Sequence, residues 1–352
     1  MRKFGIVGGF LGAGKTTVML ALSGYYKTRG IGCVLVTNDF CAGELVDALY
    51  SEKQGAEVQA MPGGCICYRT RELGGVLEEA FEGGADIVLS DIPGSSAGAL
   101  DCVYRAHEWG DITLAPFITV LDPQRLPLLS DDDSFYRTHL PPDLRELMRS
   151  EILEADAVVL NKIDTVSGEE AVQASELIGS ISPGTPVFQV SAKRGDGIGE
   201  LAEYILSSET SLTQPEGLGS DVPTVASQLK LSRYRCSYYV KVCCDDFSPD
   251  EYITSFLEQA RYTFASFNAN MPHMKVFAAS PSGEYAKYSM TGIDYPLDAD
   301  HPFGGRATEL SVVINAGFVS PAGLAEDVMK ICIDTAGKKF GLDTMIFASE
   351  CR

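Results

Sequence analysis

A glycine-rich loop with one lysine and one threonine lies near the start of the chain. Residues 9–16 read GFLGAGKT and fit G-x-x-x-x-G-K-[ST] without a mismatch, between an apolar run and a helical pattern. Such a loop closes backbone N–H groups around phosphates, while Lys15 reaches the β- and γ-phosphates and Thr16 ligates Mg²⁺. The expected phosphate-binding residues are Gly9, Gly12, Ala13, Gly14, Lys15, Thr16 and Thr17.

An acid that could serve the same Mg²⁺ follows the apolar run 87–89. Asp91 stands at the carboxyl end of this run, where ligands bind in open α/β sheets, and it can hold Mg²⁺ through water. Gly94 can offer its N–H to the γ-phosphate. A lone D-x-x-G is weak, but after a phosphate-binding loop and a strand it predicts a nucleotide site.

Two further loops indicate which base is bound. Residues 161–164 read NKID, and the Asp164 carboxylate can accept two hydrogen bonds from guanine that adenine cannot offer. Residues 190–193 read VSAK, like the last guanine-contact loop of GTPases. We therefore expect GTP with Mg²⁺, contacted by Asn161, Lys162, Asp164, Ser191, Ala192 and Lys193. A small-molecule kinase shares the phosphate loop, but NKID argues against it, and a preference for ATP would revive it.

The elements that must position these residues alternate along the first two thirds of the chain. Apolar runs occur at 4–7, 34–37, 87–89, 117–121, 157–160 and 187–190, and helical patterns at 15–27, 143–154, 169–180 and 198–206. Strands that are apolar throughout and joined by helices are typical of a mainly parallel sheet covered on both faces. The fold class is α/β: a P-loop NTPase followed by a smaller α/β domain.

The chain predicts two domains and a linker. We place a P-loop domain at 1–207, a linker at 208–228 and a second domain at 229–352. The second domain contains two similar strand–helix–strand patterns, each with Ser-Pro before its helix, which predict a ferredoxin-like sandwich. Residues 281–309 would be an insertion between the two patterns, most simply a loop packed on a sheet.

Composition limits the partners. The formal net charge of −20 repels nucleic-acid backbones and anionic membranes. The apolar N-terminal stretch is interrupted by Gly8, Gly9, Gly12 and Lys15, which argues against a signal peptide, and no apolar run is long enough to span a bilayer. The ten cysteines are then most simply reduced thiols, so we expect a cytoplasmic protein.

Together with FITVLD at 117–122, GCIC at 64–67 and NKID, the sequence GFLGAGKTT resembles the CobW-type GTPases, relatives of the HypB and UreG metal-centre GTPases. The resemblance covers residues 1–206 well and the rest only in general α/β character. It implies a GTP-dependent metallochaperone or a role in cofactor insertion. It also implies a client metalloenzyme or corrinoid protein and a nucleotide-dependent homodimer, which no residue pattern here shows.

The resemblance also implies a transition-metal site. The family carries C-x-C-C, whereas residues 65–68 here read CICY, and the family's N-E-F segment corresponds to Asn38-Asp39-Phe40, with an acid at Glu44. Carried over, the ligands are Cys67, Asp39 and Glu44, with Cys65 as a further candidate. Thiolate and carboxylate ligands suit Zn²⁺ or Co²⁺. The alternative is that both cysteines are packing residues and both acids act at Mg²⁺.

These observations favour a GTP-hydrolysing metallochaperone with slow intrinsic turnover. Lys15, Asp91 and Asp39 are the expected catalytic residues, with Asp39 the candidate for positioning water and a Mg²⁺ or structural role its alternative. Two other functions stay open. One is a GTPase chaperone for a corrinoid or metallocofactor client that binds no metal itself, and the other is a non-catalytic metal-binding module.

Overall fold

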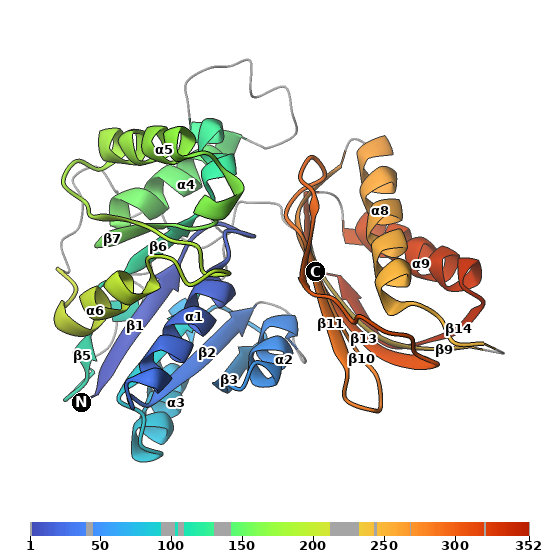
Figure 1. Cartoon of the computed structure of the whole chain (residues 1–352), viewed down its shortest axis with the longest axis horizontal. Coiled ribbons are helices and arrows are strands. Elements are labelled where there is room, and N and C mark those ends of the chain that lie inside the picture. Colours follow the sequence, from blue (N-terminus) through green and yellow to red (C-terminus); the bar gives the residue numbers. More distant parts are fainter. Residues whose placement is uncertain are drawn as a thin grey trace. The chain divides into compact units, whose positions relative to one another are not determined.

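The computed structural model describes residues 2–39, 45–92, 103–104, 109–129, 142–211, 232–242, 245–267, 269–319 and 322–351 (Figure 1). The chain divides into two compact units, Met1–Ala42 with Ser51–Leu229 and Gly43–Tyr50 with Lys230–Arg352. Most of the expected 208–228 linker lies outside the described residues. Within those ranges, no helix is both long and apolar enough to cross a membrane.

The first unit contains a parallel sheet in the order β3-β2-β4-β1-β6-β7-β8, with β5 also paired to β1. Its strands are β1 (Lys3–Gly8), β2 (Cys33–Asp39), β3 (Glu57–Pro62), β4 (Ile87–Asp91), β5 (Thr113–Leu114), β6 (Ile118–Leu121), β7 (Ala157–Leu160) and β8 (Val187–Gln189). Its helices are α1 (Lys15–Thr28), α3 (Thr70–Glu82), α4 (Pro142–Glu154), α5 (Gly168–Ile181) and α6 (Ile198–Ser207). The predicted mainly parallel α/β sheet is confirmed.

Helices cover both faces of this sheet. Val18 on α1 and Leu201 on α6 are fully buried and share one core cluster with Val120 of β6. Successive strand residues point to opposite faces, so Thr119 faces the other side, where its hydroxyl donates to the carbonyl of Glu151 on α4. The carboxyl ends of the parallel strands therefore meet at one edge, and the loops that follow them gather there.

The second unit contains an antiparallel sheet in the order β12-β11-β10-β13-β9-β14. Its elements are β9 (Ser232–Val242), α8 (Pro249–Ser266), β10 (Asn270–Ala279), β11 (Tyr285–Met290), β12 (Leu297–His301), β13 (Glu309–Val319), α9 (Ala322–Lys339) and β14 (Leu342–Cys351). Both helices lie on one face of the sheet (Figure 1). Two β-α-β units in the order β14-β9-β13-β10 make the predicted ferredoxin-like arrangement. The loop predicted at 281–309 is wrong, because β11 and β12 extend the sheet there.

A short part of the N-terminal sequence belongs to the second unit. Helix α2 (Val46–Lys53) begins there, and the N–H of Val46 donates to the Asn315 Oδ1 atom on β13 at 2.7 Å. Asp47 forms an ion pair with Lys275 on β10. The predicted domain 1–207 is continuous, whereas residues 43–50 group with the second unit.

Helix α4 carries a buried carboxyl group. The Glu151 side chain is 1% exposed, and neither of its oxygens has a hydrogen-bond partner among the described residues. Burial raises the pKa of Glu151 to about 8, against the opposing charge of Lys15, and the charge of Glu154 adds to the rise. When the pKa of a carboxyl group is higher in the folded state than in the unfolded state, the folding stability that the group contributes is lost as pH rises between the two values.

We predict that the free energy of unfolding falls as pH rises from about 4.5 to about 8 through Glu151. Glu151→Gln keeps the shape but removes this titration, so its melting temperature at pH 8 should exceed that of the wild type by a few degrees. Thermal melts between pH 5 and pH 8 test this, with the exposed Glu79→Gln on α3 as the control. An unchanged pH slope in Glu151→Gln would contradict the assignment.

Candidate nucleotide and metal site

The loop between β1 and α1 has a backbone that only glycine tolerates. Gly9, Gly12 and Gly14 have φ angles of 123°, 80° and 94°. A Cβ on Gly9 would lie 2.1 Å from the carbonyl oxygen of Val120, and one on Gly14 would lie 2.4 Å from the Asn161 Nδ2 atom. The glycines of the motif are therefore required both by backbone angle and by close approach.

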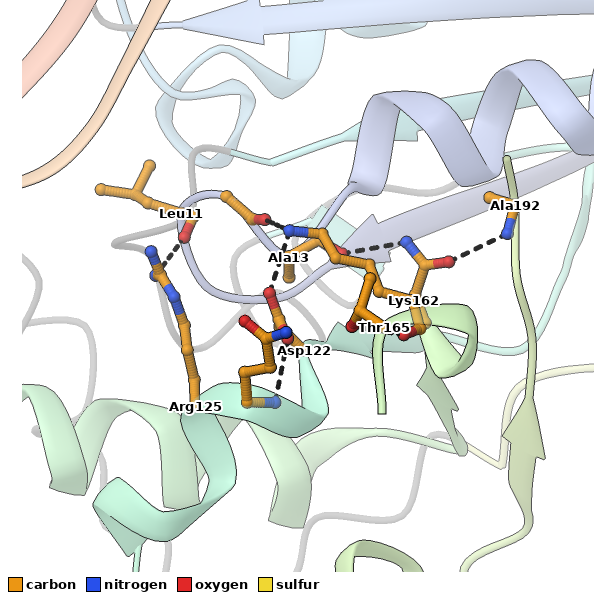
Figure 2. Close-up of polar contacts among 10 residues, drawn as sticks. Leu11, Ala13, Asp122, Arg125, Lys162, Thr165 and Ala192 are labelled. Carbon is orange, nitrogen blue, oxygen red and sulfur yellow. Dashed lines mark hydrogen bonds and ion pairs between the residues drawn. The ribbon is translucent and has the colours of Figure 1, made fainter. Parts of the chain in front are cut away.

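Three consecutive carbonyl groups of this loop accept hydrogen bonds from side chains that follow β6 and β7 (Figure 2). The guanidinium of Arg125 donates to Leu11 O. Lys162 Nζ donates to Gly12 O at 2.8 Å, and Asn161 Nδ2 donates to Ala13 O at 3.1 Å. Fixing these carbonyls fixes the peptide planes whose N–H groups an anion would contact.

Lys162, which binds the P-loop, also forms an ion pair with Asp122. Asp122, directly after β6, is 4% exposed and accepts from Lys162 Nζ at 2.9 Å. Lys162 has a φ of 62°, and it is the one non-glycine residue with positive φ within the described part of the chain. Backbone strain of this kind persists only where surrounding contacts impose it, and such strain is concentrated at functional sites.

The two loops expected to select the base contact one another. The Asn161 Oδ1 atom accepts from the N–H of Ala192 at 3.1 Å, and the Ser191 hydroxyl donates to the Asp164 carboxylate at 2.7 Å. Asn161 therefore connects the phosphate loop to both base loops, since its amide also reaches Ala13. Lys193 follows in the same loop, two residues after Ser191.

Oxygen donors suited to Mg²⁺ lie on neighbouring elements. Thr16 is in the first turn of α1 and Asp91 ends β4, and each side chain is 6% exposed. Strands β1 and β4 pair with Val7 opposite Asp91, so both donors lie at the same edge of the sheet. Hard carboxylate and hydroxyl oxygens are the ligands that Mg²⁺ prefers. At the P-loop itself, Lys15 Nζ donates to Gly9 O at 2.7 Å.

The two candidate thiols face one another. Cys65 and Cys67 flank Ile66 at the start of the turn η1 (Ile66–Tyr68), and their Sγ atoms are 2.7 Å apart. Cys65 is 2% exposed, whereas the side chain of Tyr68 is 73% exposed. The two sulfur atoms lie close together, and both would reach one metal ion, at about 2.3 Å from each, once they move apart. Tyr68 is directed to solvent.

The other predicted metal ligands fall where the structure gives no side-chain position. The backbone of Asp39 ends β2, but its side chain, Glu44 and Gly94 lie outside the described residues. Across the described residues, no group of three His, Cys, Asp or Glu side chains could hold a metal ion. The mixed thiolate and carboxylate site therefore stays a prediction.

Sequence reasoning missed three residues that organise this site. Asp122 and Arg125 hold Lys162 and the P-loop, and Asn38 contacts both Asp91 and the cysteine loop. Asp122 carried a usable signal, because a polar residue directly after a buried strand lies at the ligand-binding edge. Asn38 stands in the Asn38-Asp39-Phe40 segment carried over from the family, but the pattern assigned it no role, and Arg125 carried no signal, because its contact to Leu11 O lies far away in the sequence.

A family model that matches a whole domain of this chain identifies its family. The family model described as "CobW/HypB/UreG, nucleotide-binding domain" matches residues 3–189, more than half of the chain. The chain belongs to the CobW/HypB/UreG family. The matched range contains the P-loop, Asp91, both cysteines and the NKID loop, so the nucleotide-binding domain of this family is present.

Named relatives within this family are distant. The "Zinc-regulated GTPase metalloprotein activator 1" of Schizosaccharomyces pombe is 24% identical over 208 residues, which cover 56% of this chain and 48% of that protein. The "Zinc chaperone CobW" of Pseudomonas aeruginosa is 27% identical over 220 residues, 54% of this chain and 56% of that protein. The match thus spans about half the length of each curated relative.

Two solved structures are also similar to this chain at low sequence identity. HypB from Helicobacter pylori, in complex with nickel, shares 18% identity over 58% of this chain and 86% of its own, with a TM-score of 0.40. Zn(II)-bound YjiA GTPase from E. coli shares 15% identity over 94% of this chain and 98% of its own, with a TM-score of 0.37.

The close approach at Gly9 generates a prediction for this CobW/HypB/UreG chain. Gly9→Ala places a methyl group against the Val120 carbonyl and must displace the P-loop, so affinity for a fluorescent GTP analogue should fall about tenfold or more. Equilibrium fluorescence titration measures this affinity, with thermal melting to confirm folding.

Gly24→Ala is the matched control for Gly9→Ala. Gly24 lies within α1, and a Cβ there would meet nothing within 4 Å. Alanine should stabilise the helix by about 0.5–1 kcal/mol and leave GTP affinity unchanged. Wild-type affinity in a folded Gly9→Ala variant would show that the Gly9 backbone is not needed for binding.

Proposed function

We propose that this chain is a GTP-hydrolysing metallochaperone that carries Zn²⁺ or Co²⁺ under nucleotide control and delivers it to a client metalloenzyme. One observation carries the proposal. A P-loop and a pair of thiols lie at the same carboxyl edge of one parallel sheet, because β3, which precedes Cys65, pairs with β2, β2 pairs with β4, and β4 pairs with β1, which precedes the P-loop. The names of the two curated relatives, a zinc chaperone and a GTPase metalloprotein activator, support the same reading.

The nucleotide half of the proposal assigns a role to each described group. The N–H groups of residues 12–16 bind the phosphates, and Lys15 exchanges its bond to Gly9 O for the β- and γ-phosphates. Asp164 accepts from guanine, while Ser191 holds one oxygen of that carboxylate in place. Thr16 and Asp91 hold Mg²⁺, which supplies positive charge that stabilises the transferring phosphoryl group.

Water activation is assigned to Asp39, at the end of β2. A carboxylate there can orient a water molecule or accept its proton. Intrinsic turnover is expected to be slow, as it is for GTPases acting without an arginine supplied by a partner. We also propose a cytoplasmic protein that forms a homodimer on GTP binding.

The metal half of the proposal assigns Cys65 and Cys67 as the thiolate pair, with Asp39 and Glu44 as the carboxylates. Two thiols and two carboxylates should hold Zn²⁺ less tightly than three thiols, which suits delivery rather than storage. Tyr68 favours the second candidate function, a GTPase that gates a client's metal cofactor, such as a corrinoid, without binding metal. Tyr68 stands where the family's C-x-C-C has its third cysteine, and its side chain is exposed.

Calorimetric titration of Zn²⁺ and Co²⁺ into the reduced protein, with a non-hydrolysable GTP analogue and Mg²⁺, separates these functions. We expect stoichiometric binding of one metal in the wild type and its loss in Cys67→Ala. Cys33→Ala is the control, because burial raises the pKa of the Cys33 thiol to about 12 and keeps it a poor ligand.

A substitution that adds a thiol to the proposed metal site provides a second test. Tyr68→Cys restores a third thiol, so its Zn²⁺ affinity should exceed that of the wild type by about tenfold or more. If the wild type binds GTP but neither metal, and Tyr68→Cys gains no metal affinity, the gating GTPase replaces the metallochaperone.

A further inference from the structure

The side chain of Asn38 holds the loop that carries the two thiols. Its Nδ2 atom donates to the carbonyl oxygens of Met61 at 2.8 Å and Gly64 at 2.6 Å, and its Oδ1 atom accepts from the N–H of Ile66 at 3.0 Å. The residue is 4% exposed. A primary amide has two donor hydrogens and one acceptor oxygen, and all three are used on this one loop.

The backbone of the same residue contacts the proposed Mg²⁺ acid. The N–H of Asn38 donates to Asp91 Oδ1 at 2.7 Å. Asn38 lies directly opposite Met61 in the pairing of β2 with β3, and β2 also pairs with β4, which ends at Asp91. Asn38 therefore stands between Asp91 on one side and the cysteine loop on the other.

Asn38 thus makes a backbone hydrogen bond to Asp91 and side-chain hydrogen bonds to the segment that carries the thiols. The charged bond from the backbone N–H to a carboxylate is of the strong type, and its strength depends on the negative charge left on Asp91 Oδ1. That charge is shared when Asp91 also serves nucleotide-bound Mg²⁺ through water. A shift of the Asn38 peptide would also move its side chain. Gly64 and Ile66 would then move with it, because the buried amide keeps its hydrogen bonds to them and has no water to replace them.

We propose that Asn38 is a positioning residue that couples Asp91 to the thiols, so that the exposure and metal affinity of Cys65 and Cys67 follow the bound nucleotide. The metal part of this proposal rests on the function proposed above, whereas the effect on the thiols does not.

The thiols can be followed without metal. The reduced full-length protein is alkylated with iodoacetamide, once with GDP and Mg²⁺ and once with a non-hydrolysable GTP analogue and Mg²⁺, and modification of Cys65 and Cys67 is followed by mass spectrometry. In the wild type the two rates should differ by about fivefold or more, the lower end of ordinary allosteric coupling. In Asn38→Asp they should be equal.

Asn38→Asp isolates the side-chain half of the link. It keeps the shape and leaves the backbone N–H to Asp91, but a carboxylate has no hydrogens to donate to Met61 and Gly64. Asn38→Ser is the second variant if thermal melting shows that Asn38→Asp is unfolded. Both variants should bind the GTP analogue like the wild type, because the hydrogen bonds of the Asn38 side chain in the described structure go to Met61, Gly64 and Ile66 and not to the P-loop.

Thr37→Val is the matched control. Thr37 precedes Asn38 in β2, is 2% exposed, and its hydroxyl has no hydrogen-bond partner within the described structure. This variant should keep the nucleotide-dependent difference in thiol rates.

Zn²⁺ titrations of the same proteins separate the two proposals. Equal wild-type thiol rates with both nucleotides, or a nucleotide response retained in folded Asn38→Asp and Asn38→Ser, would overturn the role of Asn38. A thiol response that depends on Asn38 in a protein that binds no Zn²⁺ supports the link and overturns the metallochaperone function.

Discussion

The site depends on how the carbonyl groups of the P-loop are held. Arg125, Lys162 and Asn161 each bind one of the successive carbonyls of Leu11, Gly12 and Ala13. With these oxygens fixed by side chains, the peptide planes cannot rotate freely, and the N–H groups keep the orientation that an anion needs. The protein's own side chains thus order the loop, so that less conformational entropy is lost when a ligand binds.

The same hydrogen bonds also connect the P-loop with the NKID loop. Asn161 and Lys162 follow β7, whereas the P-loop follows β1, and β6 lies between these strands. Asp122, at the end of β6, joins them through its bond to Lys162. The NKID loop, to which we assign selection of the base, therefore also shapes the phosphate loop through Asn161 and Lys162.

Sequence patterns predicted what depends on local chemistry. The P-loop, Asp91 and the NKID loop were found because each combines an apolar strand with a polar motif of fixed spacing. Strand β3 (Glu57–Pro62) was missed because EVQAMP has no run of β-branched residues and draws its stability from pairing with β2. Arg125 and the contacts of Asn38 were missed because tertiary contacts to backbone carbonyls leave no trace in spacing. The placement of Val46 and Asp47 in the second unit was missed for the same reason.

We propose that GTP hydrolysis releases a metal held by Cys65 and Cys67, and a single-turnover experiment follows both events. Protein loaded with one Zn²⁺ and GTP is mixed with Mg²⁺ and a chromophoric chelator, and phosphate and released Zn²⁺ are followed together. Zn²⁺ should appear at the rate of GTP hydrolysis and should be retained when a non-hydrolysable analogue replaces GTP. Release at the same rate with GTP and with the analogue would contradict it.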